Sequence, residues 1–244
     1  YGSIAFYQAA IAKGIKPIIG VETYVARRSM GEKEGKADAQ PFHLILLATE
    51  MQGYLNLCRL ITDAHVDGYY YKPRIDREHL AKYSQGLVGL SACLGGEIPK
   101  ALETDDWESA RRLAGEYGEI FGKDGFFLEL QDHGLPEQHR LNEALLRLGP
   151  EVGLPLVVTN DLHYVHQSQA EAHDVLLCVG TGNNLDTPKQ SWCVGNMTTG
   201  GSAGASLEAN TDTRTLVDLL FMQTAAVNAD PNNCSLGDYV NRNA

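Results

Sequence analysis

The feature that most constrains the fold is an alternation of short apolar segments with longer segments of helical spacing, which continues from residue 3 to about residue 182. Five segments are rich in branched apolar residues and are typical of strands: 16–26, 42–49, 86–93, 125–134 and 154–158. Between and around them, apolar residues recur at helical spacing over 3–14, 50–66, 98–121, 136–153 and 168–182. This order predicts an α/β domain, built as a parallel sheet or barrel with crossover helices.

The fifth of these strands ends in the stretch VVTNDLHY, residues 157–164. If the backbone stays extended, Asp161 and His163 point to the same side, because successive side chains of a strand alternate. A carboxylate and an imidazole at the carboxyl end of a buried strand suit a zinc or manganese site. The alternative at this point is a turn with a surface histidine.

Other polar residues occupy comparable positions. Most lie late in or just after a predicted strand, and only His43 begins one; the set is Glu22, His43, Cys93, Glu129, Asp161 and His163. Taken singly, each has a simpler explanation: a solvated acid, a core histidine or a small buried thiol. Together they predict one metal-binding mouth at an end of the sheet, since carboxylate, imidazole and thiolate are zinc and manganese ligands.

The net charge and the cysteine content limit which partners and which cellular location we expect. Acidic residues outnumber basic residues 31 to 20, for a formal net charge of -11, so general attraction to a nucleic-acid backbone is not expected. The five cysteines are odd in number and widely spaced, which does not resemble a disulfide framework. We expect a reducing, cytoplasmic location, with no signal peptide and no membrane span.

The composition changes after about residue 190. Residues 191–213 are rich in Gly, Ser and Thr and are typical of a linker, and residues 214–244 form a tail with one candidate helix and no assignable function. The chain also begins at Tyr1, inside a predicted helix, which suggests a fragment.

Seven stretches, in order, carry a resemblance to a known family: YGSIAFYQAAIAKGIKPIIGVETYV, HLILLAT, GYYYKPRID, GLVGLSACLGGEIP, FFLELQDHGLPEQHRLN, LPLVVTNDLHY and AEAHDVLLCVGTGNNLDTP. They resemble the polymerase and histidinol phosphatase (PHP) domain of the bacterial replicative DNA polymerase III alpha subunit. The resemblance covers roughly residues 1–190, which we take as the extent of an amino-terminally truncated domain.

The resemblance implies a partial, distorted, TIM-like β/α barrel that holds a metal cluster at one end. The metal ligands that it implies are Glu22, His43, Cys93, Asp161 and His163, with Asp161 and His163 also expected to be catalytic. Glu129 is expected to support the ligands from a neighbouring position, whereas His133 receives no ligand role and His173 is expected to cap or pack a helix. Two ligand motifs that open the family, His-x-His and Thr-Asp-His-Gly-Asn, do not occur here.

For function, the resemblance implies a zinc- or manganese-dependent phosphoesterase of the 3′–5′ proofreading exonuclease type, within a magnesium-dependent, DNA-synthesising parent nucleotidyltransferase. The expected partners are DNA and other replicase subunits, including a proofreading exonuclease subunit. Two alternatives stay open: a non-catalytic scaffold that docks a proofreading subunit, and a free-standing PHP phosphoesterase. No polymerase active site is expected in this chain.

The stretch GYYYKPRID, residues 68–76, allows two further interpretations. Aromatic and basic side chains together can stack on bases and hold phosphates, which makes Lys72 and Arg74 candidate nucleic-acid contacts. The alternative is a packed loop anchored by its tyrosines.

Overall fold

The computed structural model describes residues 2–133, 135–161, 163–164, 166–181 and 184–185. The predicted linker at 191–213 and the tail at 214–244 lie outside the described residues. The chain divides into two compact units: Tyr1–Glu129 with Ala144–Val157, and Leu130–Glu143 with Val158–Ala244.

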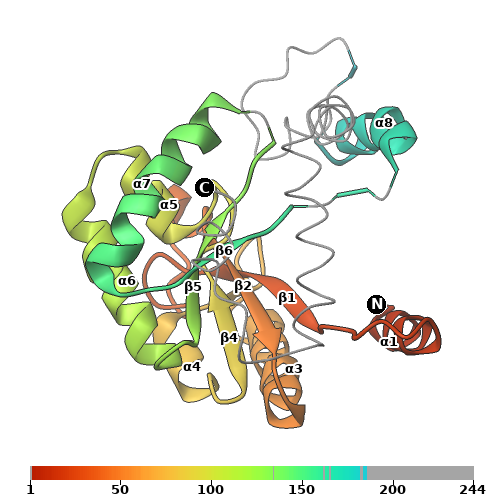
Figure 1. Ribbon diagram of the computed structural model, residues 1–244, viewed down its shortest axis with the longest axis horizontal. Coiled ribbons are helices and arrows are strands. Elements are labelled where there is room, and N and C mark those ends of the chain that lie inside the picture. Colours follow the sequence, from red (N-terminus) through yellow and green to blue (C-terminus); the bar gives the residue numbers. More distant parts are fainter. Residues whose placement is uncertain (1, 134, 162, 165, 182–183, 186–244) are drawn as a thin grey trace, which may run out of the picture. The chain divides into compact units, whose positions relative to one another are not determined.

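The described residues form a mixed sheet of six strands in the order β3-β1-β2-β4-β5-β6 (Figure 1). The strands are β1 (Gly20–Val25), β2 (Phe42–Ala48), β3 (Arg74–Ile75), β4 (Leu87–Leu90), β5 (Phe126–Leu130) and β6 (Leu156–Val158). Five of them lie within the segments expected from the sequence, and β3 is an additional short strand. The α/β class is confirmed, and the sheet with its helices agrees with the expected partial β/α barrel.

The expectation of a parallel sheet is wrong for β2. This strand runs antiparallel to both of its neighbours, β1 and β4, whereas β1 with β3 and β4 with β5 are parallel. Val25 at the end of β1 pairs with Phe42 at the start of β2, so residues 26–41 form a long hairpin connection. Their one helix in the described structure, α2 (Gly35–Asp38), has four residues, which is too short to act as a crossover helix.

Except for the short helix at residues 77–82, which was not expected, the following helices lie in the segments predicted from the sequence. They are α1 (Ser3–Ala12), α3 (Met51–Val66), α4 (Arg77–Lys82), α5 (Glu97–Glu103), α6 (Trp107–Phe121), α7 (Pro136–Val152) and α8 (Ala170–Thr181), with a 3-10 turn at Gln167–Gln169. The single long helix expected over 98–121 is two helices. Asp105 between them has a φ of 60°, a left-handed conformation that interrupts the helix, and Asp106 caps the second one through Ser109 N.

The two faces of the sheet differ in burial, which decides where a site can form. On one face Thr23 of β1 pairs with Leu44 of β2, and Leu44 and Leu46 are almost fully buried. Helix α3 contacts β1, β2, β3 and β4. The opposite face of β1 and β2 carries Glu22, which is exposed, and Tyr24, His43 and Ile45, which are partly buried. Functional side chains on this second face are therefore accessible.

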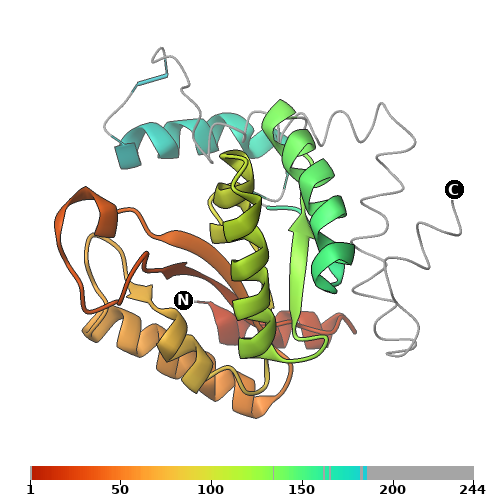
Figure 2. The ribbon, with the colours of Figure 1, turned by 90° about the vertical axis from the view of Figure 1, so that its left-hand side faces the viewer.

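Helix α6 packs against the part of the sheet that β4 and β5 form (Figures 1 and 2). The ring of Tyr117 stacks on Phe126 of β5 at 4.9 Å between centroids, and Phe121 stacks on the same ring at 5.7 Å. The Tyr117 hydroxyl donates to Glu97 Oε2 at 2.9 Å, and Arg77 Nη1 donates to both oxygens of that carboxylate. Burial, together with the Glu97 charge, raises the pKa of Tyr117 well above its ordinary value.

No helix in the described part of the chain is both long enough and apolar enough to span a membrane.

Candidate metal centre

The strand register brings two predicted ligands together. Glu22 is two residues before Tyr24 in β1, and Tyr24 pairs with His43 of the antiparallel β2. Residues two apart on a strand share a face, so Glu22 and His43 project from the same side of neighbouring strands. Because β2 runs antiparallel to β4, the first residues of β2 lie beside the end of β4. His43, at the start of β2, therefore lies near Cys93, which follows the end of β4.

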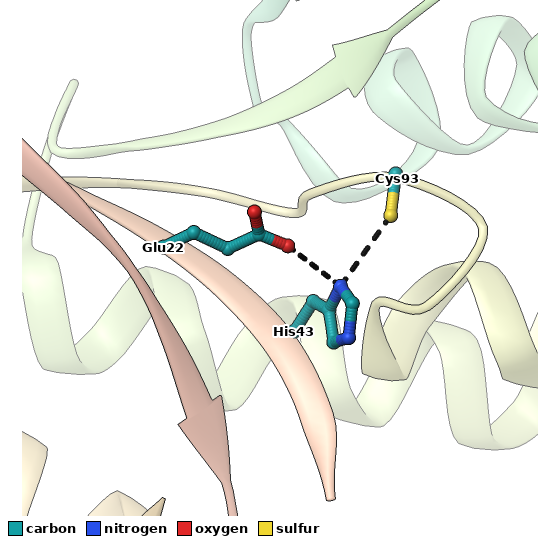
Figure 3. A group of neighbouring side chains, drawn as sticks. All are labelled: Glu22, His43 and Cys93. Atoms are coloured by element: carbon teal, nitrogen blue, oxygen red, sulfur yellow. Dashed lines mark hydrogen bonds and ion pairs between the residues drawn. The ribbon is translucent and has the colours of Figure 1, made fainter. Parts of the chain in front are cut away.

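Three predicted ligands converge at this edge (Figure 3). His43 Nδ1 lies 2.6 Å from Glu22 Oε1 and 3.6 Å from Cys93 Sγ. One donor atom from each residue lies within 4.8 Å of the others. Exposure falls from 41% for the Glu22 side chain through 25% for His43 to 8% for Cys93, so the group faces solvent on the carboxylate side.

The segment after β4 places the thiol by local geometry. Ala92 is almost fully buried and has a φ of 62°, a left-handed conformation that is rare for a non-glycine residue. The backbone N–H of Gly95 donates to Cys93 Sγ at 3.4 Å, and its carbonyl accepts from the His43 N–H at 2.9 Å. A Cβ at Gly96 would lie 2.0 Å from the Ser91 carbonyl oxygen. Through Gly95, the sequence SACLGG thus links the thiol to the start of β2.

The donor set fits a divalent metal ion. A neutral imidazole carries one proton on one nitrogen, so Nδ1 cannot both donate to Glu22 and accept from the Cys93 thiol. Nitrogen, carboxylate oxygen and sulfur turned toward a common point are instead the three ligand types that zinc takes in proteins. Thiolate is a soft ligand and selects zinc over manganese.

Tyr24 is a member of this group that the sequence prediction missed. Its ring meets the His43 ring edge-on, with 5.3 Å between centroids and 79° between planes. It restricts the rotation of the imidazole from the side of β1. The available signal was its spacing, because a residue two positions after Glu22 on a strand must share the face of Glu22.

Glu129 lies in β5 and is buried, with 4% exposure. Its backbone N–H donates to Ser91 Oγ at 2.8 Å, and Ser91 lies two residues before Cys93. Glu129 therefore lies beside the segment that carries the thiol, and its supporting role stays a prediction.

Asp161 and His163 belong to the second unit and lie after β6, which ends at Val158. His163 Nδ1 is 3.7 Å from Asp161 Oδ1 and 3.0 Å from the Asp161 carbonyl oxygen, so the two predicted ligands are neighbours. Their convergence with Glu22, His43 and Cys93, which belong to the first unit, stays a prediction.

His173 lies inside α8 and packs, as one of its two expected roles requires. Its ring is 6.0 Å from that of His163 and 5.7 Å from that of Tyr164. Burial lowers the pKa of His173, and His163 lowers it further, while Asp174 opposes this change.

His133, which was given no ligand role, lies in the motif QDHGLPEQ and forms a hydrogen-bond network with Gln138 and Asn160. It is buried, and its Nε2 lies 2.9 Å from Asn160 Oδ1 while its Nδ1 and backbone N–H contact the Gln138 amide. Asn160 immediately precedes Asp161, so this network fixes the backbone from which Asp161 projects.

The structure separates the two candidate nucleic-acid contacts. Arg74 is 0% exposed, and its guanidinium donates to the carbonyl oxygens of Gly68, Asp38, Met30 and Glu32. Burial lowers its pKa, against the Asp38 charge. A guanidinium held in this way cannot reach a phosphate, so the packed-loop alternative applies to Arg74. Lys72 is exposed, and its role stays a prediction.

Comparison with known proteins gives two results. A family model described as PHP domain matches residues 1–133. The chain is 47% identical over 192 residues to the DNA polymerase III subunit alpha of Thermus aquaticus, covering 78% of this chain and 16% of that protein. It is 44% identical over 183 residues to the protein of the same name from Borreliella burgdorferi, and 42% identical over 191 residues to that of Treponema pallidum. The chain spans 16% of the length of each of these relatives.

Proposed function

The chain belongs to the PHP domain family, and on this premise we propose that it is part of a DNA polymerase III alpha subunit whose PHP domain is a metal-dependent phosphoesterase. The reaction type is removal of a nucleotide from a 3′ end, as in a proofreading exonuclease. The observation that carries the proposal is the group Glu22, His43 and Cys93, which presents oxygen, nitrogen and sulfur within 4.8 Å of one another.

In this proposal Glu22, His43 and Cys93 hold the metal ion, and Asp161 and His163 complete the ligand set and take part in the reaction. When bound, a divalent metal supplies Lewis-acid polarisation of a phosphodiester and activation of a water molecule. The protein residues fix its position: Cys93 is held by Gly95, and His43 by Tyr24 and Glu22. The thiol favours zinc, and manganese is the alternative.

The parent protein, in the same proposal, synthesises DNA with magnesium in a polymerase site outside this chain. Its partners are DNA and other replicase subunits, including a proofreading exonuclease subunit, and its location is the bacterial cytoplasm. The names of the relatives support the parent assignment. We also propose that the PHP domain continues past residue 133, to about residue 190, because the resemblance persists through the Asn-Asp-Leu-His segment.

A non-catalytic scaffold is the second candidate function. It is favoured by α1, an apolar helix on which Ile4, Phe6 and Ile11 are 71%, 56% and 53% exposed. Exposed apolar side chains gathered on one element are typical of surfaces that another protein segment covers. A free-standing phosphoesterase is not favoured by any feature of the described structure.

The deciding experiment compares the purified 244-residue chain with the variants Glu22→Gln and Cys93→Ala. Metal content is measured by mass spectrometry, and release of nucleotides from a labelled single-stranded primer is followed with added zinc or manganese. The proposal expects bound metal and metal-dependent release in the unaltered chain, with both reduced in the variants. His65→Asn is the matched control, because His65 is exposed on α3 and bonds to the Ile61 carbonyl.

Metal binding without nucleotide release would favour the scaffold function. An unaltered chain with neither metal nor activity, while circular dichroism reports a folded protein, would overturn the proposed phosphoesterase.

A further inference from the structure

The segment before β3 holds an exposed aromatic ring in a strained conformation. Tyr71 has a φ of 58°, a left-handed value that is unfavourable for a residue with a bulky side chain. Its side chain is nevertheless 70% exposed, so burial of the ring does not explain the strain. The backbone N–H of Tyr70 donates to the Lys72 carbonyl at 3.0 Å, which closes the turn.

The base of this turn is firmly anchored. The Tyr70 ring lies 5.3 Å from the guanidinium of the buried Arg74 and meets the Tyr71 ring edge-on at 4.8 Å. Arg74 is in turn fixed by four backbone carbonyl oxygens. Tyr71 and Lys72 are therefore presented to solvent from a rigid support.

Lys72 lies near the candidate metal centre, because the Tyr24 ring contacts both Lys72 and His43. Its Nζ is 5.4 Å from the centroid of the Tyr24 ring, and that ring meets His43 edge-on at 5.3 Å. The register agrees, because Tyr24 pairs with Arg74 in parallel strands and Lys72 precedes Arg74 by two residues, as Glu22 precedes Tyr24. In the described part of the chain Lys72 forms no ion pair with a carboxylate.

We propose that Lys72 and Tyr71 form a subsite for single-stranded DNA beside Glu22, His43 and Cys93, in which the ammonium group holds a backbone phosphate and the Tyr71 ring stacks on a base. Lysine binds phosphate as a compact point charge with three donors, and aromatic rings stack on any base. With a net charge of -11, general attraction to DNA is not expected, so contact with a strand depends on local cations such as Lys72 and the bound metal ion.

The subsite rests on the proposed phosphoesterase function, since it assigns the residues that would hold a DNA strand at the metal centre. An exposed ring beside the lysine favours a nucleic-acid strand over a small phosphate ester, which has no base to stack.

The test measures binding of a fluorescently labelled oligothymidine to the 244-residue chain by anisotropy, with a chelator present so that metal does not contribute. Lys72→Gln and Tyr71→Leu are each expected to weaken binding about tenfold, the scale of one lost phosphate or stacking contact. Lys72→Gln should also reduce the slope of log affinity against log salt by about 0.7. Tyr71→Phe retains the ring and should bind as the unaltered chain does.

Two controls match these changes. Lys123→Gln removes an exposed lysine from the loop before β5, and Tyr7→Leu removes a 49% exposed tyrosine from α1. Equal binding by the Lys72, Tyr71 and control variants would overturn the subsite. Loss of binding in Lys72→Gln alone, with displacement of the oligonucleotide by inorganic phosphate, would overturn its assignment to DNA.

The failure of the subsite can be told apart from failure of the proposed function. Metal content and nucleotide release that depend on Glu22 but not on Lys72 or Tyr71 would leave the function and remove the subsite. DNA binding that depends on Lys72 and Tyr71, in a chain that binds no metal ion, would keep the subsite and overturn the proposed function.

Discussion

His43 Nδ1 lies 2.6 Å from Glu22 Oε1, across two antiparallel strands that a long hairpin joins. At this distance from a carboxylate the ring nitrogen carries a proton and donates it. A metal ion bound by the same nitrogen requires that proton to move to Nε2, which releases none from a neutral ring, whereas binding by Cys93 releases the thiol proton.

Zinc affinity should therefore rise with pH. We expect an increase of about tenfold per pH unit while the Cys93 thiol of the metal-free chain is protonated, and a levelling of the affinity once that thiol is ionised. Competition with a chromogenic chelator at several pH values measures it. An affinity independent of pH throughout would mean that Cys93 does not bind the ion as a thiolate.

Replacing Cys93 by Ser should weaken zinc binding by more than about 100-fold, because even residues that only support metal ligands cost about 10- to 100-fold when altered. Manganese affinity should change less, since manganese does not prefer sulfur. Cys58→Ser is the control, because Cys58 is exposed on α3. Equal zinc affinities of the two variants would exclude Cys93 as a ligand.

The edge of the sheet at which these residues gather could be predicted from sequence, because Glu22 and Cys93 occur late in or just after apolar strands. His43 was the exception, and its place depends on β2 running antiparallel. The direction of a strand depends on the connection that leads into it and on the strands with which it pairs. Apolar periodicity carries no information about either. Tyr24 could have been added by its spacing from Glu22, but its edge contact with His43 depends on the register.

The role of Arg74 could not be predicted for a different reason. Charged residues in a loop are mostly exposed, and the four carbonyl acceptors of Arg74 come from segments up to 44 residues away. The break between α5 and α6 was missed because Asp105 adopts a left-handed conformation that Asp tolerates but does not require.

Arg74→Lys should destabilise the chain although it keeps the charge. An ammonium group cannot reach all four carbonyl oxygens of Gly68, Asp38, Met30 and Glu32, and buried acceptors without donors are costly. We expect a loss of about 3 kcal/mol in the free energy of unfolding, measured by denaturant titration. Amide exchange in residues 26–41 should also accelerate. Unchanged stability and exchange would show that Arg74 does not hold this connection.

Asp63 should contribute a pH-dependent part of the stability. Burial opposes its ionisation, but hydrogen bonds from His79 Nε2 and Arg59 Nε, each 2.8 Å, outweigh it and lower the pKa of Asp63. A lowered folded pKa gives stability that is present above the ordinary aspartate pKa of about 3.9 and is lost as the pH falls through the folded pKa. Asp63→Asn should therefore flatten stability against pH at the acid end.

Gly96→Ala should affect both stability and the metal centre. A Cβ there would lie 2.0 Å from the Ser91 carbonyl oxygen and 3.0 Å from the Pro99 ring, so the segment carrying Cys93 has to move. We expect a loss of about 1–3 kcal/mol in the free energy of unfolding, together with weaker zinc binding.

Gly115→Ala is the matched comparison. A Cβ at Gly115 meets no atom within 4 Å, and the residue is exposed inside α6. Alanine should stabilise this helix by about 0.5–1 kcal/mol without changing zinc binding. Chemical denaturation and zinc competition on both variants make the comparison. If Gly96→Ala kept full stability and zinc affinity, the close packing of Gly96 under Ser91 would not be what positions the thiol.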